Sequence, residues 1–365
     1  MVVVDWSKLP TELLNLISQR IDNEVDLIRF QSICSTWRAS SVPNHHHILP
    51  FKFPLLQTPF FSHQIETLIN IDLPFGYLSK HNFFLIKPPQ QQQQQTLLRP
   101  WLIRVCQNTR GQTQLFHPLF HHYPLPRIRL VLDFNKLSVL HLGSNNFIKD
   151  HDIKTDNGKY RFPIKVVAVT CHGKKPLVAV APAFPPQPLL LKCGDGKWKV
   201  ILDMSTGFGD ICLFKGWPYV VDKIGKTVMV GPDSSVHLVA EPLVGRGNKK
   251  FLAESKGDLL LADVYDPDLN DSVWIDLFKL NEKEKKWVKL TSLGDRVLFL
   301  GEVCSFSVSA SDLCVAKGNC VIFSYSIICS SKSESCILDL DQGRHSPLSD
   351  YPEYSNLFWP PPKWI

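Results

Sequence analysis

The fold class is decided by the stretch Trp217-Pro218-Tyr219-Val220-Val221-Asp222, which the residues Lys223–Lys226 connect to Thr227-Val228-Met229-Val230. Two short runs rich in β-branched and aromatic residues flank a brief turn, which is the pattern of an antiparallel hairpin. Similar runs recur on both sides, at Trp101–Val105 with Leu115-Phe116, Trp198–Ile201, Leu259–Ala262, Trp274–Leu280 and Trp287–Leu290. The sequence therefore predicts a mainly antiparallel β domain over residues 101–350.

An internal similarity favours a ring of repeated units. Gly196-Lys197-Trp198-Lys199-Val200-Ile201 resembles Lys285-Lys286-Trp287-Val288-Lys289-Leu290, and the two tryptophans are 287 − 198 = 89 residues apart. That separation is about twice ~44 residues, the length of a four-stranded propeller blade. Three-stranded meanders can give the same spacing by chance. We nevertheless expect a β-propeller-like domain rather than a single sandwich, with the number of blades open.

The composition agrees with short strands joined by loops. The 365 residues include 27 prolines, 22 phenylalanines, 9 tryptophans and 8 tyrosines, and aromatic residues favour strands. With 44% hydrophobic and 20% charged residues, the chain can form a packed core, and overall disorder is excluded.

The positive charge is spread over the middle of the chain. The net charge is 40 − 34 = +6, and residues 43–160 hold 12 basic against 6 acidic side chains. No run of five basic residues occurs there, whereas nucleic-acid-binding proteins usually show a dense basic stripe. We predict no nucleic-acid partner.

The sequence also bears on compartment. The start, Met1–Trp6, lacks the charged and apolar regions of a secretory signal, and no run of about 18 apolar residues occurs. The ten cysteines are therefore expected to be reduced, and those from Cys304 to Cys336 lack the close pairs of a zinc site. We predict a protein of the cytoplasm or nucleus that neither enters a membrane nor binds a metal.

Residues 5–42 have a helical pattern instead. Leu13, Leu14, Ile17 and Ile21 form one apolar stripe, and Leu27, Phe30 and Cys34 form a second. Three helices in so few residues bury little surface, so such a module normally borrows core from a partner. The pattern alone leaves two interpretations open, a docking surface or a helical cap that packs on the rest of the chain.

These residues resemble an F-box. The resemblance lies in Leu9-Pro10-x-Glu12-Leu13-Leu14-x-x-Ile17 and in Asp26-Leu27-x-Arg29-Phe30-x-x-Ile33-Cys34-x-x-Trp37-Arg38. It implies a three-helix module at 5–42 that docks on a Skp-type adaptor and, through it, on a cullin-RING ubiquitin ligase. The implied contact residues are Leu9, Pro10, Leu13, Leu14 and Ile17, with Leu27, Phe30, Cys34 and Trp37 supplying core and the remaining surface.

The C-terminal half resembles a plant family that joins an F-box to a KIB-type domain, the SKIP-like F-box proteins. The similar segments are Ser292–Gly301, Ser305–Ala310, Lys317–Cys320, Gly257–Leu261 and Leu277–Leu280. One departure is Cys314-Val315-Ala316, where the family often has Pro and Gly. The resemblance implies that the β domain recruits a protein substrate for ubiquitination.

Residues 43–100 read as a junction rich in Pro and Phe. Near its end, Pro88-Pro89 precedes the glutamine tract Gln90–Gln95, which we expect to be a solvated loop.

We find no motif for catalysis or cofactor binding. Gly207-Phe208-Gly209-Asp210 stops short of a phosphate-binding loop. The segment that starts at Asp266 begins like a calcium loop but has Asp271 where glycine is needed and Leu277 where glutamate is needed. We therefore expect no cofactor.

Three hypotheses follow. The leading one is a non-catalytic adaptor that brings a protein target to a Skp-cullin-F-box ubiquitin ligase. The second is a propeller that binds or hydrolyses a small ligand, with the helices as a cap. The third is a protein that sequesters its partner, for example a kinase.

Overall fold

The computed structural model describes residues 5–41, 52–54 and 75–365, with internal gaps. The gaps are 22–23, 89–97, 108–112, 121–123, 126–131, 150–163, 170–176, 182–187, 193–198, 202–203, 205–206, 232, 244–246, 248, 266–272, 302 and 329–333. The glutamine tract lies outside the described residues. So do the histidine clusters His45–His47 and His121-His122, which have no carboxylate or cysteine at metal-ligand spacing, and the sequence neighbours Cys171-His172, which do not form the usual catalytic pair.

Helices are short and concentrated at the two ends of the chain. They are α1 (Thr11–Ser18), α2 (Glu24–Ser32), α3 (Ser35–Ser40), α6 (Ala310–Leu313) and α7 (Pro352–Ser355). Single 3-10 turns occur at Trp6–Lys8, Tyr325–Ile327 and Leu348–Asp350. Among the described residues, no helix has the length and apolar character needed to span a membrane.

Most of the described chain forms β-strands. The early ones are β1 (Lys52–Pro54), β2 (Phe75–Lys87), β3 (Trp101–Gln107), β4 (Thr113–Phe116), β5 (Ser138–Lys149), β6 (Ile164–Val169), β7 (Leu177–Ala181), β8 (Leu189–Lys192) and β9 (Lys199–Val200). The middle ones are β10 (Phe208–Phe214), β11 (Trp217–Asp222), β12 (Thr227–Val230), β13 (Val236–Ala240), β14 (Lys249–Ser255), β15 (Asp258–Tyr265), β16 (Trp274–Asn281) and β17 (Lys286–Leu290). The last are β18 (Arg296–Leu300), β19 (Ser305–Ser309), β20 (Cys320–Ser324), β21 (Ser335–Asp339) and β22 (Arg344–Pro347).

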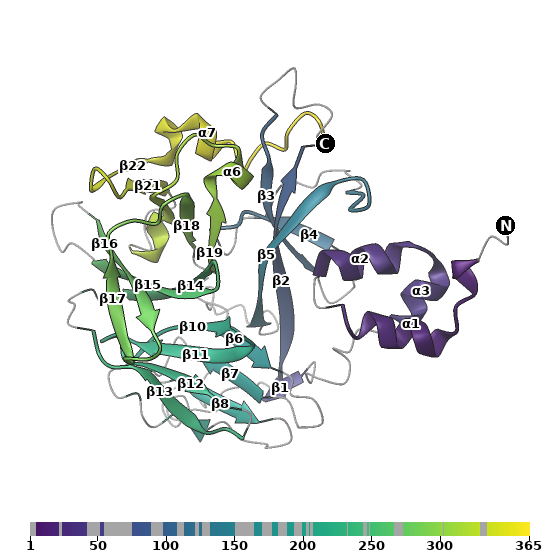
Figure 1. The fold of residues 1–365 in the computed structure, drawn as a ribbon, viewed down its shortest axis with the longest axis horizontal. Helices are drawn as coiled ribbons and strands as arrows, with labels where there is room; N and C mark the ends of the chain where they lie inside the picture. The colour runs from purple at the N-terminus through teal and green to yellow at the C-terminus, as the bar shows by residue number, and fades with distance from the viewer. Residues whose placement is uncertain are drawn as a thin grey trace, which may run out of the picture.

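These strands form four sheets. The first has nine strands in the order β4-β3-β2-β5-β6-β7-β8-β9, with β1 paired to β2. Two four-stranded meanders follow, β10 to β13 and β14 to β17, and the last sheet has the order β19-β18-β20-β21-β22. Pairing is antiparallel except between β18 and β20. Figure 1 shows the sheets arranged around a common centre, which confirms the expected β-propeller.

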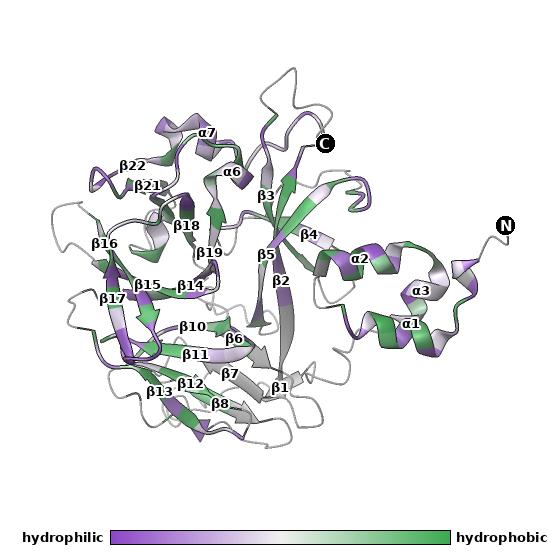
Figure 2. Ribbon diagram, in the orientation of Figure 1, coloured by the Kyte–Doolittle hydropathy of each residue, from purple (hydrophilic) through white to green (hydrophobic). Residues whose placement is uncertain are grey.

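Each sheet of the ring is buried on both faces, as β18 illustrates. Val297 and Phe299 pack with residues of β2, β3 and β5, whereas Leu298 and Leu300 pack with residues of β14, β15 and β16. Because successive side chains of a strand point to opposite faces, one apolar run serves two neighbouring sheets. Figure 2 shows hydrophobic stretches, in green, in strands of the ring such as β10, β15 and β19.

The end of the chain closes the ring on the first sheet. The Leu102 amide donates to the carbonyl of Leu357 at 2.7 Å, and Trp101 Nε1 donates to the carbonyl of Phe358 at 2.7 Å. An ion pair between Lys87 of β2 and Asp312 of α6, the helix that follows β19, connects the first sheet to the last one. The first and the last sheet are therefore held together by contacts between distant parts of the sequence.

The expected hairpins are confirmed. β3 pairs with β4, and β11 pairs with β12 through the predicted turn. The two similar tryptophan segments fall at β9 and β17, each the last strand of its sheet. Trp198 itself lies outside the described residues. From β9 to β17 the chain passes through two four-stranded sheets, so the 89-residue interval corresponds to two repeats.

The boundary of the β domain at residue 101 was wrong. Strand β2 (Phe75–Lys87) lies within the stretch that the sequence assigned to a junction, and it is the central partner of β3 and β5. The surrounding prolines and the glutamine tract obscured this strand, although Phe83–Ile86 is a continuous apolar run that is fully buried.

The departure at Cys314 coincides with a tight helix end. Helix α6 stops there, and Cys314 has φ of +53°, a left-handed conformation that favours glycine. The turn therefore forms with a residue other than glycine in this conformation.

Candidate partner-binding surfaces

Helix α1 presents an apolar face to solvent. Pro10 lies just before its first turn, and the amide of Leu14 donates to the carbonyl of Pro10 at 3.1 Å. Leu13, Leu16 and Ile17 are 47%, 52% and 43% exposed. These three side chains, at i, i+3 and i+4, share one side of the helix. We call them the α1 face.

The three N-terminal helices pack on one another through a small core. Leu14 is fully buried, and the ring of Phe30 lies 4.5 Å from that of Trp37. The indole of Trp37 donates to the carbonyl of Trp6 at 3.2 Å, and Asn15 Nδ2 donates to the carbonyl of Ser40 at 3.3 Å. These contacts fix the orientation of α1 relative to α2 and α3.

The nine residues that the resemblance assigned to adaptor contact divide by accessibility. The exposed ones are Pro10, Leu13 and Ile17; the half-buried ones are Leu9, Leu27, Cys34 and Trp37; the buried ones are Leu14 and Phe30. Leu14 is thus not available as a surface contact in this structure and supplies core, as Phe30 does. A role of the exposed residues in docking stays a prediction.

Sequence reasoning missed three exposed apolar side chains of this region. Leu16 belongs to the α1 face, and Trp6 and Ile33 are 64% and 57% exposed. Leu16 had a usable signal, since it lies three residues after Leu13 on the same side of the helix. The surface beside it is slightly hollowed, between Thr11, Glu12, Asn15 and Leu16.

Helix α2 attaches the N-terminal helices to the ring. Val25 is 1% exposed and belongs to the same apolar cluster as Phe84, Ile86 and Trp101 of the first sheet. Asn135 Nδ2 also donates to the Ser32 hydroxyl at 2.7 Å. Figure 1 shows the three helices outside the ring, with α2 next to the first sheet and α1 below α2 in this view. The exposure of Leu13, Leu16 and Ile17 shows that the propeller does not cover the α1 face.

Polar side chains meet where the inner strands of the ring lie side by side. Lys165 of β6 pairs with Asp210 of β10 at 2.7 Å, and the second oxygen of Asp210 accepts from the Leu252 amide of β14 at 2.8 Å. Burial opposes the charged form of Lys165, but Asp210 outweighs it and raises the pKa of the ammonium group. This ion pair joins three units of the ring.

Two thiols next to this ion pair are held in the protonated state. Burial raises the pKa of Cys304 to about 12, and burial together with Asp210 raises that of Cys212 well above its usual range. Because the thiolate is the reactive form of cysteine, both side chains are suited to packing and not to nucleophilic chemistry.

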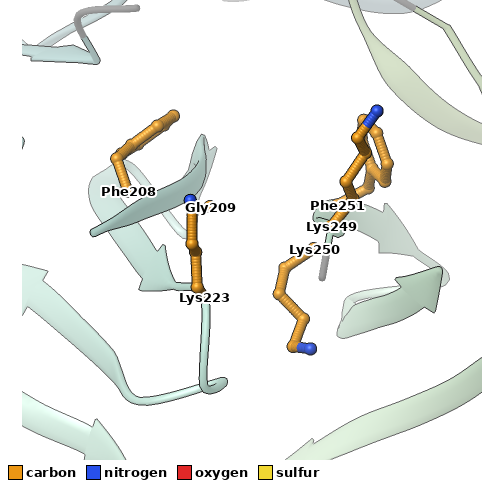
Figure 3. A pocket seen from close by; sticks show the side chains of 6 residues that line it. All are labelled: Phe208, Gly209, Lys223, Lys249, Lys250 and Phe251. Atoms are coloured by element: carbon orange, nitrogen blue, oxygen red, sulfur yellow. The ribbon is translucent and has the colours of Figure 1, made fainter. Parts of the chain in front are cut away.

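A pocket lies at the inner side of the ring, between the beginnings of β10 and β14. Its volume is about 320 Å³, and it is lined by Phe208, Gly209, Lys223, Lys249, Lys250 and Phe251. Figure 3 shows Phe208 and Lys223 on one side and Phe251 and the two other lysines on the opposite side. Sequence patterns do not indicate this pocket, because its residues come from strands that only the fold brings together.

The sequence segments considered for cofactors have structural roles where they are described. Phe208-Gly209-Asp210 begins strand β10, and Leu277 of the calcium-like segment is buried in β16. Across the described part of the chain, no three His, Cys, Asp or Glu side chains gather in a way that could hold a metal ion.

Comparison with known proteins adds a family and several relatives. The family model of the KIB1-4 β-propeller matches residues 75–349. The F-box protein At2g17036 of Arabidopsis thaliana is 31% identical over 401 residues, covering 100% of this chain and 95% of the relative. The F-box protein SKIP23 of Arabidopsis thaliana is 31% identical over 406 residues, covering 100% of this chain and 96% of the relative.

Proposed function

The chain belongs to the KIB1-4 β-propeller family, and we propose that it is the substrate-recognition subunit of a Skp-cullin-F-box ubiquitin ligase. In this proposal, α1 to α3 form an F-box whose exposed apolar face docks on a Skp-type adaptor. The propeller holds a protein target, and the cullin-RING subunits carry out ubiquitin transfer. The protein would act in the cytoplasm or nucleus, where its partners would meet it.

The observation that carries the proposal is the α1 face. Leu13, Leu16 and Ile17 are large apolar side chains that a small helical module leaves in water. Contiguous exposed apolar side chains on a small domain usually mark an interface, and burial of the exposed half of each would contribute roughly 0.7–1.5 kcal/mol. The relatives named as F-box proteins align over the whole chain, including these helices.

The attachment of α2 to the ring supports the same function. A ligase adaptor works by proximity, so the target has to be held at a fixed position relative to the adaptor. Val25 is buried against the first sheet, and this contact attaches the helices, to which we assign adaptor binding, to the ring, to which we assign target binding.

The inner polar cluster supports a role without catalysis. Both oxygens of Asp210 accept hydrogen bonds from the protein, and Lys165 is engaged by Asp210. The neighbouring thiols are protonated at neutral pH. A general base or nucleophile needs a free, suitably ionised group, which these four side chains do not supply.

Adaptor binding tests the proposal. Leu13→Asp combined with Ile17→Asp places two charges on the α1 face without touching the buried Leu14, so the module should still fold. Co-purification of the full chain with a Skp-type adaptor should then fall by at least ten-fold. The matched control is Leu213→Asp with Val288→Asp, since these residues are 46% and 43% exposed on the ring.

Equal adaptor binding by both double variants would place the interface elsewhere. No binding by the wild-type chain would overturn the proposal. A reconstituted ligase then separates recruitment from sequestration, because only recruitment leads to ubiquitin transfer to the bound target.

A further inference from the structure

We propose that the pocket between β10 and β14 binds a short acidic peptide segment of the target protein. The inference rests on the proposed function, since it names the chemistry by which the propeller would recognise a target. The pocket is defined by the six lining residues given above, and its charge, rigidity and size carry the argument.

The first argument is charge. Three of the six lining residues are lysines and none is acidic, and because the buried Asp263 matches the charge of Lys250, the positive charge of the pocket comes from Lys223 and Lys249. Lys223 is exposed in the turn between β11 and β12, and its side chain forms no hydrogen bond or ion pair with another described residue. An anionic group in the pocket would meet this ammonium group without first displacing a carboxylate from it.

The second argument is that the other two lysines are held in place. Lys249 Nζ donates to the carbonyls of Ile327 and Ile328 at 2.7 and 2.8 Å, and Lys250 is paired with the buried Asp263. Their side chains therefore lose little freedom when a ligand binds, which lowers the entropic cost of association. Lys223 supplies the one adaptable contact.

The third argument is the combination of charge with two half-buried aromatic rings. Phe208 and Phe251 stand on opposite sides of the opening. An apolar side chain flanked by carboxylates would fit between the rings while its neighbours meet Lys223 and Lys249. Since ligand pockets usually measure roughly 300–1,000 Å³, a pocket of about 320 Å³ accommodates a few side chains at most.

The position of the pocket suits a segment of a larger protein. β10 and β14 are edge strands of their sheets and face each other at the inner side of the ring, and the pocket opens where both begin. It lies in the ring and not on α1 to α3, so target and adaptor would occupy separate surfaces.

Binding of labelled peptides by the full-length protein tests the inference. The first probe is a fluorescein-labelled nonapeptide with four aspartates around one phenylalanine, and the second has asparagine in place of each aspartate. A third probe carries phosphoserine in place of two aspartates and distinguishes phosphate from carboxylate as the preferred group. We expect fluorescence anisotropy to show binding of the first or third probe, weakening with added salt, and no binding of the second.

The decisive variant is Lys223→Glu, because Lys223 is exposed and supports no other described side chain. It should weaken binding by about five- to ten-fold. The matched control is Lys283→Glu in the turn after β16, which makes the same charge change on an exposed lysine far along the chain. Equal weakening by both variants would mean a general charge effect and would overturn the assignment of the pocket.

Absence of binding by all three probes at low salt would also overturn the inference. Adaptor co-purification measured on the same samples keeps the two proposals apart. Lys223→Glu should leave adaptor binding unchanged. If the wild-type chain binds the peptide but not the adaptor, the proposed ligase role is rejected. The proposal that the pocket binds an acidic segment is then retained.

Discussion

Arg29 of α2 donates through Nε to the backbone carbonyl of Phe134 at 3.0 Å, although the two residues are 105 positions apart in the sequence. A second donor of the same guanidinium, Nη2, reaches the carbonyl of Leu137 at 3.3 Å. One side chain thus ties the N-terminal helices to the segment that leads into β5. These two hydrogen bonds help to orient α2 on the ring, because the apolar contact of Val25 is non-directional.

Arg29→Ala should loosen the helices from the ring without unfolding either part. Both carbonyls lose a donor, and the contacts that remain, the apolar packing of Val25 and the Asn135–Ser32 hydrogen bond, hold the angle of α2 less firmly. We expect faster hydrogen exchange in α2 and a change in Tm of the ring of less than about 2 °C, since surface substitutions usually change stability by about 0.5 kcal/mol or less.

Arg38→Ala is the matched control for this prediction. Arg38 Nε donates to the carbonyl of Gln31 at 3.2 Å, and both residues belong to the helical module and not to the ring. If Arg38→Ala accelerated exchange in α2 as much as Arg29→Ala, the effect would belong to the helices themselves and not to their attachment.

Gly247→Ala should destabilise the ring by about 3 kcal/mol. A Cβ at Gly247 would lie 1.9 Å from Asp263 Oδ1, so the buried pair of Lys250 and Asp263 would have to separate. The carbonyl of Gly247 also accepts from Lys250 Nζ at 2.6 Å. Urea unfolding measures the loss.

Gly257→Ala serves as the control for the glycine substitution. A Cβ at Gly257 would meet nothing within 4 Å, although φ there is +77°. Its cost of about 1–2 kcal/mol would be that of the left-handed backbone alone. A smaller loss for Gly247→Ala than for Gly257→Ala would show that the ion pair adjusts to the added methyl group.

Acid should destabilise the protein partly through His117. Burial, and next the charge of Arg104, lowers the pKa of His117 to about 3, whereas an unfolded histidine titrates near pH 6.5. The unfolded chain therefore binds a proton that the folded chain does not. Stability is unaffected above about pH 6.5 and falls as the pH decreases towards 3, by at most about 1.4 kcal/mol per pH unit from this group.

His117→Asn tests this origin of the pH dependence. Nδ1 of His117 accepts from the Leu119 amide at 3.2 Å, and the asparagine oxygen can take over that role without titrating. The difference in unfolding free energy between variant and wild type should shrink as the pH falls from 7 to 4.5. A constant difference over that range would assign the acid sensitivity to other groups.

Trp364→Ala should weaken closure of the ring by about 2 kcal/mol, because a partly buried indole and its hydrogen bond are lost. Trp364 Nε1 donates to the carbonyl of Arg99 at 3.0 Å and packs on the same cluster as Val25. Trp274, which is 60% exposed, provides the comparison through Trp274→Ala. Equal unfolding free energies of the two variants would show that Trp364 does not stabilise the closed ring.

The sequence predicted what depends on local pattern. The hairpin of β11 and β12 and the helices at 5–42 follow from residue type and spacing over a few positions, and the structure contains both. The 89-residue interval between similar tryptophan segments also indicated a repeat correctly.

What escaped prediction depends on contacts between distant residues. Leu14 and Leu16 are equally apolar, and only the packing of α1 on α3 makes one buried and the other exposed. Lys165 and Asp210 are 45 positions apart with no shared motif. Lys223 and Lys249 join one pocket only because β10 and β14 are neighbours in the ring. Such pairings require the order of the sheets, which periodicity does not contain.

Because the C-terminal tail closes the ring, the ring can be completed only when synthesis of the chain is nearly finished. Trp101 and its acceptor Phe358 are 257 residues apart, so at a ribosomal rate of about 5–20 residues per second they are made roughly 13 to 50 seconds apart. The first sheet ends at Val200, so it is complete 358 − 200 = 158 residues, or roughly 8 to 32 seconds, before the segment that covers it is made. The nascent chain thus carries an apolar sheet face that chaperones can bind, and its N-terminal helices are available long before the ring is complete.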